Sequence, residues 1–123
     1  MAKDYKDLLI WKKSMDLVVE IYHLVKRLPK EETYSLSDQM RRAAISIPSN
    51  IAEGFFRHSS RQYIQFLSVA RGSTAELETQ LLIAIRLKYF TEFQSNNALN
   101  LCNEILKMLS KMIIKLETKD KNH

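Results

Sequence analysis

Two pairs of polar residues with matching spacing are the first candidates for chemistry in this sequence. Asn50 and Glu53 lie three residues apart, so they share one face of a helix, and Ser73 and Glu76 repeat that spacing. Carboxylates on two helices could hold a metal ion as in di-iron bundles, but those bundles need a Glu-x-x-His motif on each of two helices, a requirement that this sequence does not meet. Small neighbouring residues let helices approach closely. The four residues are therefore predicted to form a partly buried polar layer that sets helix register, with no metal ion and no cofactor.

A ridge of lysines near the C-terminus is the second candidate. Lys107, Lys111 and Lys115 recur every four residues with no acid between them, so they line one side of a helix. Such a ridge can neutralise phosphates of RNA or DNA, whereas the commoner role of a lysine face is to keep a protein soluble. No aromatic residues alternate with these lysines, so base stacking is not predicted. Four arginines in the second helical segment and at the turn into the third are further candidates for nucleic-acid binding: Arg41, Arg42, Arg57 and Arg61.

Signatures of catalysis are absent from the sequence. There is no P-loop, dinucleotide-binding glycine pattern, HExxH or GxSxG motif. Cys102 is the single cysteine and lies on an apolar helix face, where a buried, inert thiol is expected. His23, His58 and His123 are scattered, without zinc-site spacing. We therefore expect no catalytic residues and a protein that acts by binding. An enzyme or metal protein built around Glu53 and Glu76 is the less favoured alternative.

Four helices must position these residues. Apolar residues spaced three and four apart predict helices over about 8–28, 36–56, 60–90 and 92–117, within one domain covering 1–123. A serine or threonine followed three residues later by an acidic residue or a glutamine is a typical N-cap pattern of a helix. This pattern predicts N-caps at Ser35, Ser59 and Thr91. Pro48 lies inside the second segment, where it either kinks the helix or divides it. The short connections predict an all-α, antiparallel up-down-up-down four-helix bundle.

Each segment has an apolar stripe that is expected to face the core. The stripe of the first consists of Leu8, Trp11, Met15, Val18, Tyr22 and Val25; that of the second consists of Met40, Ala44, Ile47, Ile51 and Phe55; and that of the third consists of Tyr63, Leu67, Ala70, Thr74, Leu77, Leu81 and Ala84.

The fourth segment carries two apolar stripes, although a surface helix of a monomeric bundle needs only one. The first contains Leu99, Cys102, Leu106, Leu109, Ile113 and Leu116, and the second contains Leu101, Ile105, Met108 and Met112. The second stripe is predicted to be an interface between copies of the chain, because exposed apolar patches mark protein contacts. The alternative is a fourth helix that lies unusually deep in its own bundle.

Composition limits the class of protein. The 123 residues include only two glycines and two prolines, which argues against an all-β fold. The formal net charge of +5 permits a polyanionic partner without requiring one. No apolar run is long enough to span a membrane, and the charged N-terminus does not resemble a signal peptide. We expect a cytoplasmic protein without a membrane partner.

Three blocks of sequence resemble the bacterial 23S rRNA intervening-sequence protein family. They are residues 8–15 followed by Leu28-Pro29, residues 39–54, and residues 66–73 followed by Glu76, and together they cover nearly the whole chain. The resemblance implies a four-helix bundle, with some family genes lying inside insertions within 23S rRNA genes. It also relates the chain to accessory proteins of diversity-generating retroelements, which are pentameric barrels with basic surfaces that engage nucleic acid and a reverse transcriptase. By that analogy the chain forms a homopentamer. The family has no established catalytic residues.

Together these observations predict a non-enzymatic, homo-oligomeric bundle that binds RNA or DNA through its basic residues. The alternative is a scaffold whose partner is another protein, with the basic face serving solubility.

Overall fold

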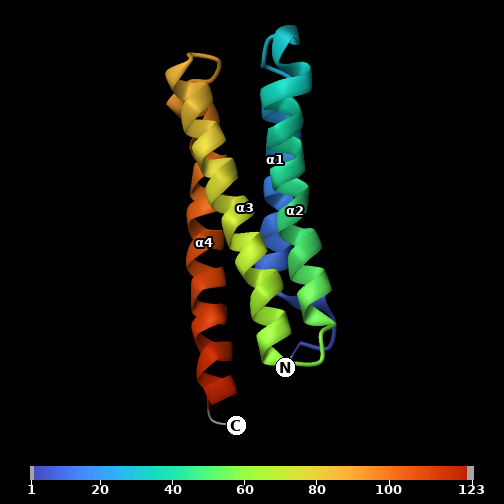
Figure 1. The fold of residues 1–123 in the computed structure, drawn as a ribbon. Coiled ribbons are helices and arrows are strands. Elements are labelled where there is room, and N and C mark those ends of the chain that lie inside the picture. The colour runs from blue at the N-terminus through green and yellow to red at the C-terminus, as the bar shows by residue number, and fades with distance from the viewer. Residues whose placement is uncertain (1, 122–123) are drawn as a thin grey trace.

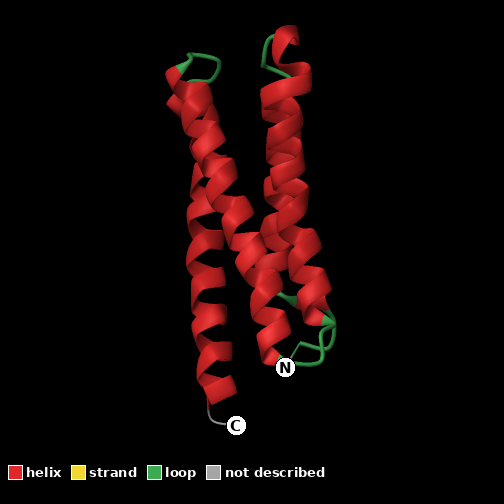
Figure 2. Cartoon of the chain, viewed as in Figure 1, coloured by secondary structure: helices red, strands yellow, loops and turns green. Residues whose placement is uncertain are grey.

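The structure is a computed structural model that describes residues 2–121, and within that range it contains helices and no strands (Figure 2). The predicted all-α class and the four helices are confirmed. Three short helical turns precede α1 or connect it to α2: η1 (Tyr5–Asp7), η2 (Lys30–Glu32) and the π-helical turn η3 (Thr33–Ser37). The long helices are α1 (Leu9–Val25), α2 (Asp38–Phe55), α3 (Ser60–Arg86) and α4 (Glu92–Lys121).

The helices lie side by side, with their connections divided between two ends of the molecule (Figure 1). The connections from α1 to α2 and from α3 to α4 lie at one end, which we call the loop end. The short turn from α2 to α3 lies at the other, together with both chain termini, and we call this the turn end. Helix α2 packs against α1 and α3, while α4 packs against α1 and α3. Each helix thus has two neighbours around a shared core.

Helix α3 ends at Arg86, four residues before the predicted end. The amide of Lys88 donates to the carbonyl of Ile85, and the amide of Tyr89 donates to that of Ala84, both at 2.9 Å. These two bonds form a Schellman motif, whose residue beyond the cap takes a left-handed conformation. Here that residue is Lys88, with φ of 65°. A glycine usually marks this position, so the stop was not readable from the sequence.

The N-termini of α3 and α4 follow the predicted capping patterns. Ser59 Oγ accepts a hydrogen bond from the amide of Gln62 at 3.2 Å. Thr91 and Gln94 form a reciprocal capping box, in which each backbone amide donates to the other's side chain at 3.0 Å. The predicted cap at Ser35 is wrong, because η3 leads directly into α2 and the Ser35 hydroxyl donates to Glu32 instead. Helix α4 also continues to Lys121, one turn beyond the predicted end.

The predicted core stripes of α2 and α3 are confirmed, since all their members are fully buried except Phe55 and Tyr63, which are half-buried. Helix α2 continues through Pro48, so the proline does not divide it. The part of the chain that the structure describes includes no helix long and apolar enough to cross a membrane.

The predicted stripe of α1 is mostly wrong. The residues that α1 buries are Ile10, Ser14, Leu17, Ile21, Leu24 and Val25, a stripe displaced by about one position from the predicted one. Of the predicted stripe, only Val25 is buried, while Met15 is 41% exposed and Tyr22 is 39% exposed. Two apolar stripes lie next to each other on this helix, and packing against α2 and α4 buries only one of them.

Candidate nucleic-acid interface

A small hydrogen-bonded group joins α2 to α3. The hydroxyls of Ser46 and Ser73 lie 2.8 Å apart, and the Asn50 amide donates to the Ser46 carbonyl at 2.8 Å and to its hydroxyl at 3.0 Å. All three side chains are half-buried. The predicted polar layer therefore exists at Asn50 and Ser73, with Ser46 as the residue that connects them. Because these bonds need one alignment of the two helices, they favour a single register.

The other two members of the predicted layer, Glu53 and Glu76, are exposed, so placing them in it was wrong. A carboxylate that stays hydrated avoids the cost of burial without a charged partner, which explains their position outside the packed surface. Gln80, one turn beyond Glu76, is buried instead.

Within residues 2–121, no three His, Cys, Asp or Glu side chains are grouped so that they could hold a metal ion. Residues Glu20 and His23, spaced as Glu-x-x-His, lie on the surface of α1 beside Arg27. His123 lies outside the described residues.

The second apolar stripe of α4 packs largely within the bundle. Ile105 is fully buried, so its assignment to an interface between copies is wrong. Leu101, Met108 and Met112 are half-buried and pack against the core. Helix α4 contacts both α1 and α3, and two neighbours require a wide apolar arc. The alternative that α4 lies deep in its own bundle therefore describes this stripe better.

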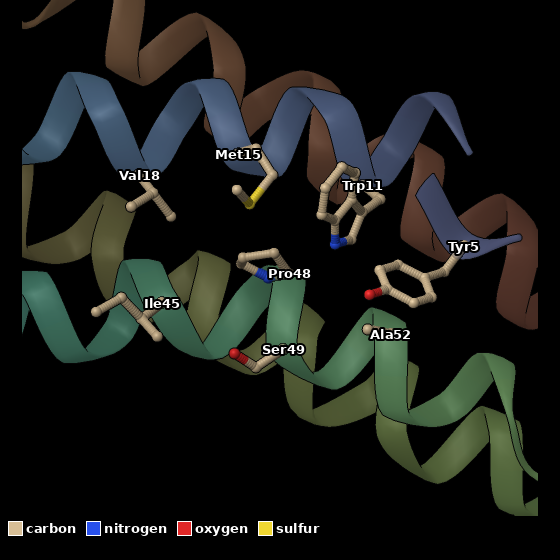
Figure 3. Close-up of a pocket in the computed structure, with 8 residues that line it drawn as sticks. All are labelled: Tyr5, Trp11, Met15, Val18, Ile45, Pro48, Ser49 and Ala52. Carbon is tan, nitrogen blue, oxygen red and sulfur yellow. The ribbon is translucent and has the colours of Figure 1, made fainter. Parts of the chain in front are cut away.

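An exposed apolar groove of about 350 Å³ lies instead between α1 and α2 (Figure 3). Trp11, Met15 and Val18 of α1 face Ile45 and Pro48 of α2 across it, and Tyr5 closes one end. The Tyr5 ring meets Trp11 edge-on, with centroids 5.4 Å apart. Ile45 is 44% exposed. Sequence reasoning missed this groove because it assigned Trp11, Met15 and Val18 to the core.

The lysine ridge is present as predicted on the outer side of α4. Lys107, Lys111 and Lys115 are exposed, and none forms an ion pair with another described residue. The nearest preceding acid, Glu104, is paired with Lys13 of α1. Lys119, which α4 also carries in helical conformation, extends the ridge by one more turn. From Lys107 to Lys119 the ridge is about 18 Å long by helical rise.

The four candidate arginines do not form one surface with the ridge. Arg41 and Arg42 lie near the start of α2, towards the loop end, and the Arg42 Nε is 3.0 Å from Asp38 Oδ2. Arg57 and Arg61 lie at the turn end, where Arg57 stacks over the Phe66 ring at 4.4 Å and approaches Glu53 at 3.9 Å. Only the turn-end pair can therefore act together with the lysines of α4.

Charge is unevenly distributed between the two ends. The segments in the turn-end half, residues 2–19, 46–73 and 101–121, contain 12 Lys or Arg against 7 Asp or Glu. The segments in the loop-end half, residues 20–45 and 74–100, contain 7 of each. The entire formal net charge of +5 therefore belongs to the turn-end half. Such an excess attracts polyanions over about one Debye length.

Cys102 is fully buried on α4, as predicted. Burial in the apolar core, with a smaller contribution from the negative charge of Glu78, raises the pKa of the Cys102 thiol to about 12. Because the thiolate is the reactive form, this side chain is not a nucleophile near neutral pH.

Comparison with known families adds a separate line of evidence. Residues 6–111 match the family model of the 23S rRNA-intervening sequence protein. The chain belongs to this family. Among solved structures, it is similar to a protein of unknown function from the S23 ribosomal protein family of Bacteroides thetaiotaomicron, with 32% identity and a TM-score of 0.79. That similarity covers 85% of this chain and 98% of the other. A comparison with curated proteins gives no match.

Membership of the 23S rRNA-intervening sequence protein family agrees with the resemblance predicted from the three sequence blocks. The matched range includes the groove except Tyr5, the polar group of α2 and α3, and Lys107 and Lys111 of the lysine ridge. Lys115 and Lys119 lie beyond the matched range, so the last turns of the ridge are features of this chain rather than of the family match.

Proposed function

We propose that this protein is a non-enzymatic, antiparallel four-helix bundle that assembles with copies of itself and binds RNA or DNA through the turn end of α4. The observation that carries the proposal is the charge distribution. The ridge of Lys107, Lys111 and Lys115 lies in the half of the molecule that contains the whole net charge, and no acid interrupts it. Binding through phosphates gives little sequence preference and a steep dependence on salt.

Charge reversal tests the binding surface. The triple variant Lys107→Glu, Lys111→Glu and Lys115→Glu is expected to abolish binding of a labelled RNA oligonucleotide, followed by fluorescence anisotropy at about 50 mM and about 200 mM salt.

A matched triple variant at the neutral loop end, Lys26→Glu, Lys30→Glu and Arg86→Glu, changes the net charge equally and is expected to retain binding. An equal loss of RNA affinity in both triple variants would show that binding responds to net charge alone. Unchanged affinity in the ridge variant would refute the proposal.

Self-assembly is supported by the groove between α1 and α2. Exposed Met15 and Ile45 in its lining make an apolar surface of the kind that marks protein contacts. Several copies would place several lysine ridges on one particle and raise its affinity for a long polyanion. A homopentamer is the assembly size expected by analogy with the accessory proteins of diversity-generating retroelements.

Light scattering on a sizing column tests the assembly. The wild-type protein is expected to elute as a homo-oligomer, and Ile45→Glu, which places a charge in the groove, is expected to shift it towards a single chain. Phe93→Glu is the matched control, because Phe93 is 90% exposed at the start of α4 and away from the groove. A wild-type protein that elutes as a single chain would refute self-assembly.

The same groove favours one second candidate function, a scaffold that binds a different protein. Co-purification of one stoichiometric partner that Ile45→Glu releases, without nucleic acid, would support the scaffold over the nucleic-acid binder.

A further inference from the structure

We propose that a hollow between α3 and α4 at the turn end receives one unpaired nucleobase, while the lysines at its rim contact the neighbouring phosphates. The hollow is lined by Tyr63, Met112, Leu116, Lys115 and Lys119. The inference rests on the proposed function and narrows its ligand to single-stranded nucleic acid, because paired bases in a duplex are not available to enter a pocket.

The lining of the hollow suits a planar, weakly polar group. Its volume is about 360 Å³, within the usual range for small-molecule pockets. An aromatic ring, a thioether and an isobutyl side chain form the apolar part. A nucleobase can stack on the aromatic ring, and methionine adapts its shape to flat ligands.

Tyr63 is held at the hollow by the backbone of α2. Gly54 has no Cβ, and a Cβ built there would lie 2.8 Å from Tyr63 Cδ1 and 3.2 Å from its Cε1. The ring therefore rests directly against the α2 backbone and cannot withdraw further in that direction. A ring positioned in this way loses little conformational freedom when a base stacks on it.

Charge at the rim identifies the class of occupant. Lys115 and Lys119 border the apolar lining and continue the ridge of Lys107 and Lys111 along α4. An uncharged apolar ligand, such as a hydrophobic peptide, would leave this row of lysines without partners. Single-stranded nucleic acid supplies both a planar base for the hollow and a phosphate chain for the ridge.

Paired oligonucleotides test the inference. One probe is an oligouridylate of about twelve nucleotides, and the other is an abasic strand with the same number of phosphates. The wild-type protein is expected to bind oligouridylate about 5- to 150-fold more tightly than the abasic strand in anisotropy titrations at one salt concentration. Tyr63→Leu is expected to remove this preference and leave the affinity for the abasic strand unchanged.

Two variants serve as controls. Tyr63→Phe keeps the ring and is expected to keep the preference. Tyr34→Leu removes a tyrosine that is 95% exposed in η3 at the loop end, and it is also expected to keep the preference. A wild-type preference that survives in Tyr63→Leu would overturn the inference.

A second measurement needs no variant. An oligouridylate carrying 5-iodouridine should crosslink to the peptide that contains Tyr63, and crosslinking only at Trp11 or Tyr34 would overturn the inference. The ridge triple variant distinguishes the two proposals. If it abolishes binding of both strands while Tyr63→Leu has no effect, the hollow is refuted and the proposed function stands. If it changes neither affinity, the proposed function fails.

Discussion

Substitution of Gly54 by alanine tests how closely α2 and α3 approach each other. Gly54 is buried near the end of α2, and its φ is not positive, so the position does not need glycine for its backbone conformation. Space is the constraint instead. An added Cβ would lie 2.8 Å from Tyr63 Cδ1 and 2.9 Å from Phe66 Cβ, closer than such atoms come in folded proteins.

The expected magnitude follows from two opposing effects. Alanine is favoured over glycine in a helix by up to about 1 kcal/mol, and less near a helix end. Overpacking a close contact typically costs about 1–3 kcal/mol. The Phe66 Cβ is attached to the α3 backbone, so it cannot move unless the helix moves, and the cost is therefore at the upper part of that range. We expect Gly54→Ala to lower the free energy of unfolding by about 1–2 kcal/mol.

Gly72 is a matched control in the middle of α3, because a Cβ built there meets no atom within 4 Å. Gly72→Ala is expected to raise the free energy of unfolding by about 0.5–1 kcal/mol, through helix propensity alone. Urea unfolding followed by circular dichroism measures both variants. Several protein concentrations separate the stability of the bundle from that of its assembly.

Opposite signs for the two substitutions would support close packing of α2 on α3. If Gly54→Ala were as stabilising as Gly72→Ala, the contact of Gly54 with Tyr63 and Phe66 would be refuted. The position of Tyr63 at the hollow would then lose its explanation.

Three further predictions concern single side chains. Lys88→Gly should raise the free energy of unfolding by about 1 kcal/mol in urea titrations, because glycine takes a positive φ without the steric cost borne by Lys88. An unchanged urea midpoint would contradict backbone strain at Lys88. Burial raises the pKa of Cys102 to about 12. The stability that its protonated thiol contributes is therefore complete below the unfolded pKa of about 8.5 and is lost as pH rises towards 12. The loss amounts to at most about 1.4 kcal/mol per pH unit. Urea titrations at about pH 8 and about pH 10 should therefore show a smaller loss for Cys102→Ala than for wild type, and equal losses would count against a buried thiol. Hydrogen bonds from Ser35 and Tyr89 lower the pKa of Glu32. The stability that the ionised Glu32 carboxylate contributes is therefore present above the unfolded pKa of about 4.3 and is lost as pH falls. Between about pH 5 and about pH 3, the melting temperature should fall more steeply for wild type than for Glu32→Gln.

Much of the bundle could be predicted from residue spacing because its signals are local. The predicted stripes of α2 and α3 are the faces that these helices bury, so residue spacing alone was enough to predict them. The capping box of Thr91 and Gln94 depends on residues three apart in the chain, and the structure has it as predicted. The end of α3 depends on the left-handed backbone conformation of Lys88, which lysine rarely takes, so the sequence does not reveal where this helix stops.

The candidate sites also differ in how far local sequence patterns could predict them. Spacing alone places Lys107, Lys111 and Lys115 on one side of a helix, and the structure has them exposed there. The hollow beside them needs Tyr63 from another helix, nearly fifty residues earlier, so no local pattern shows it. No aromatic residue alternates with the lysines within α4, but Tyr63 of α3 lies beside Lys115 and Lys119.

The sequence by itself determined four helices, an inert cysteine and an uninterrupted row of lysines, because each depends on residues within a few turns of one helix. Only the tertiary structure decided which apolar stripes face the core. Helices α1 and α4 both have two such stripes, and periodicity predicts both equally well. In α4 the second stripe is buried at Ile105 and half-buried at its other three positions, whereas packing of α1 against α2 and α4 leaves Met15 and Tyr22 exposed. Each helix packs against two others, so which of its sides is buried depends on where those neighbours lie and how they are shaped, and that information is not local in the chain.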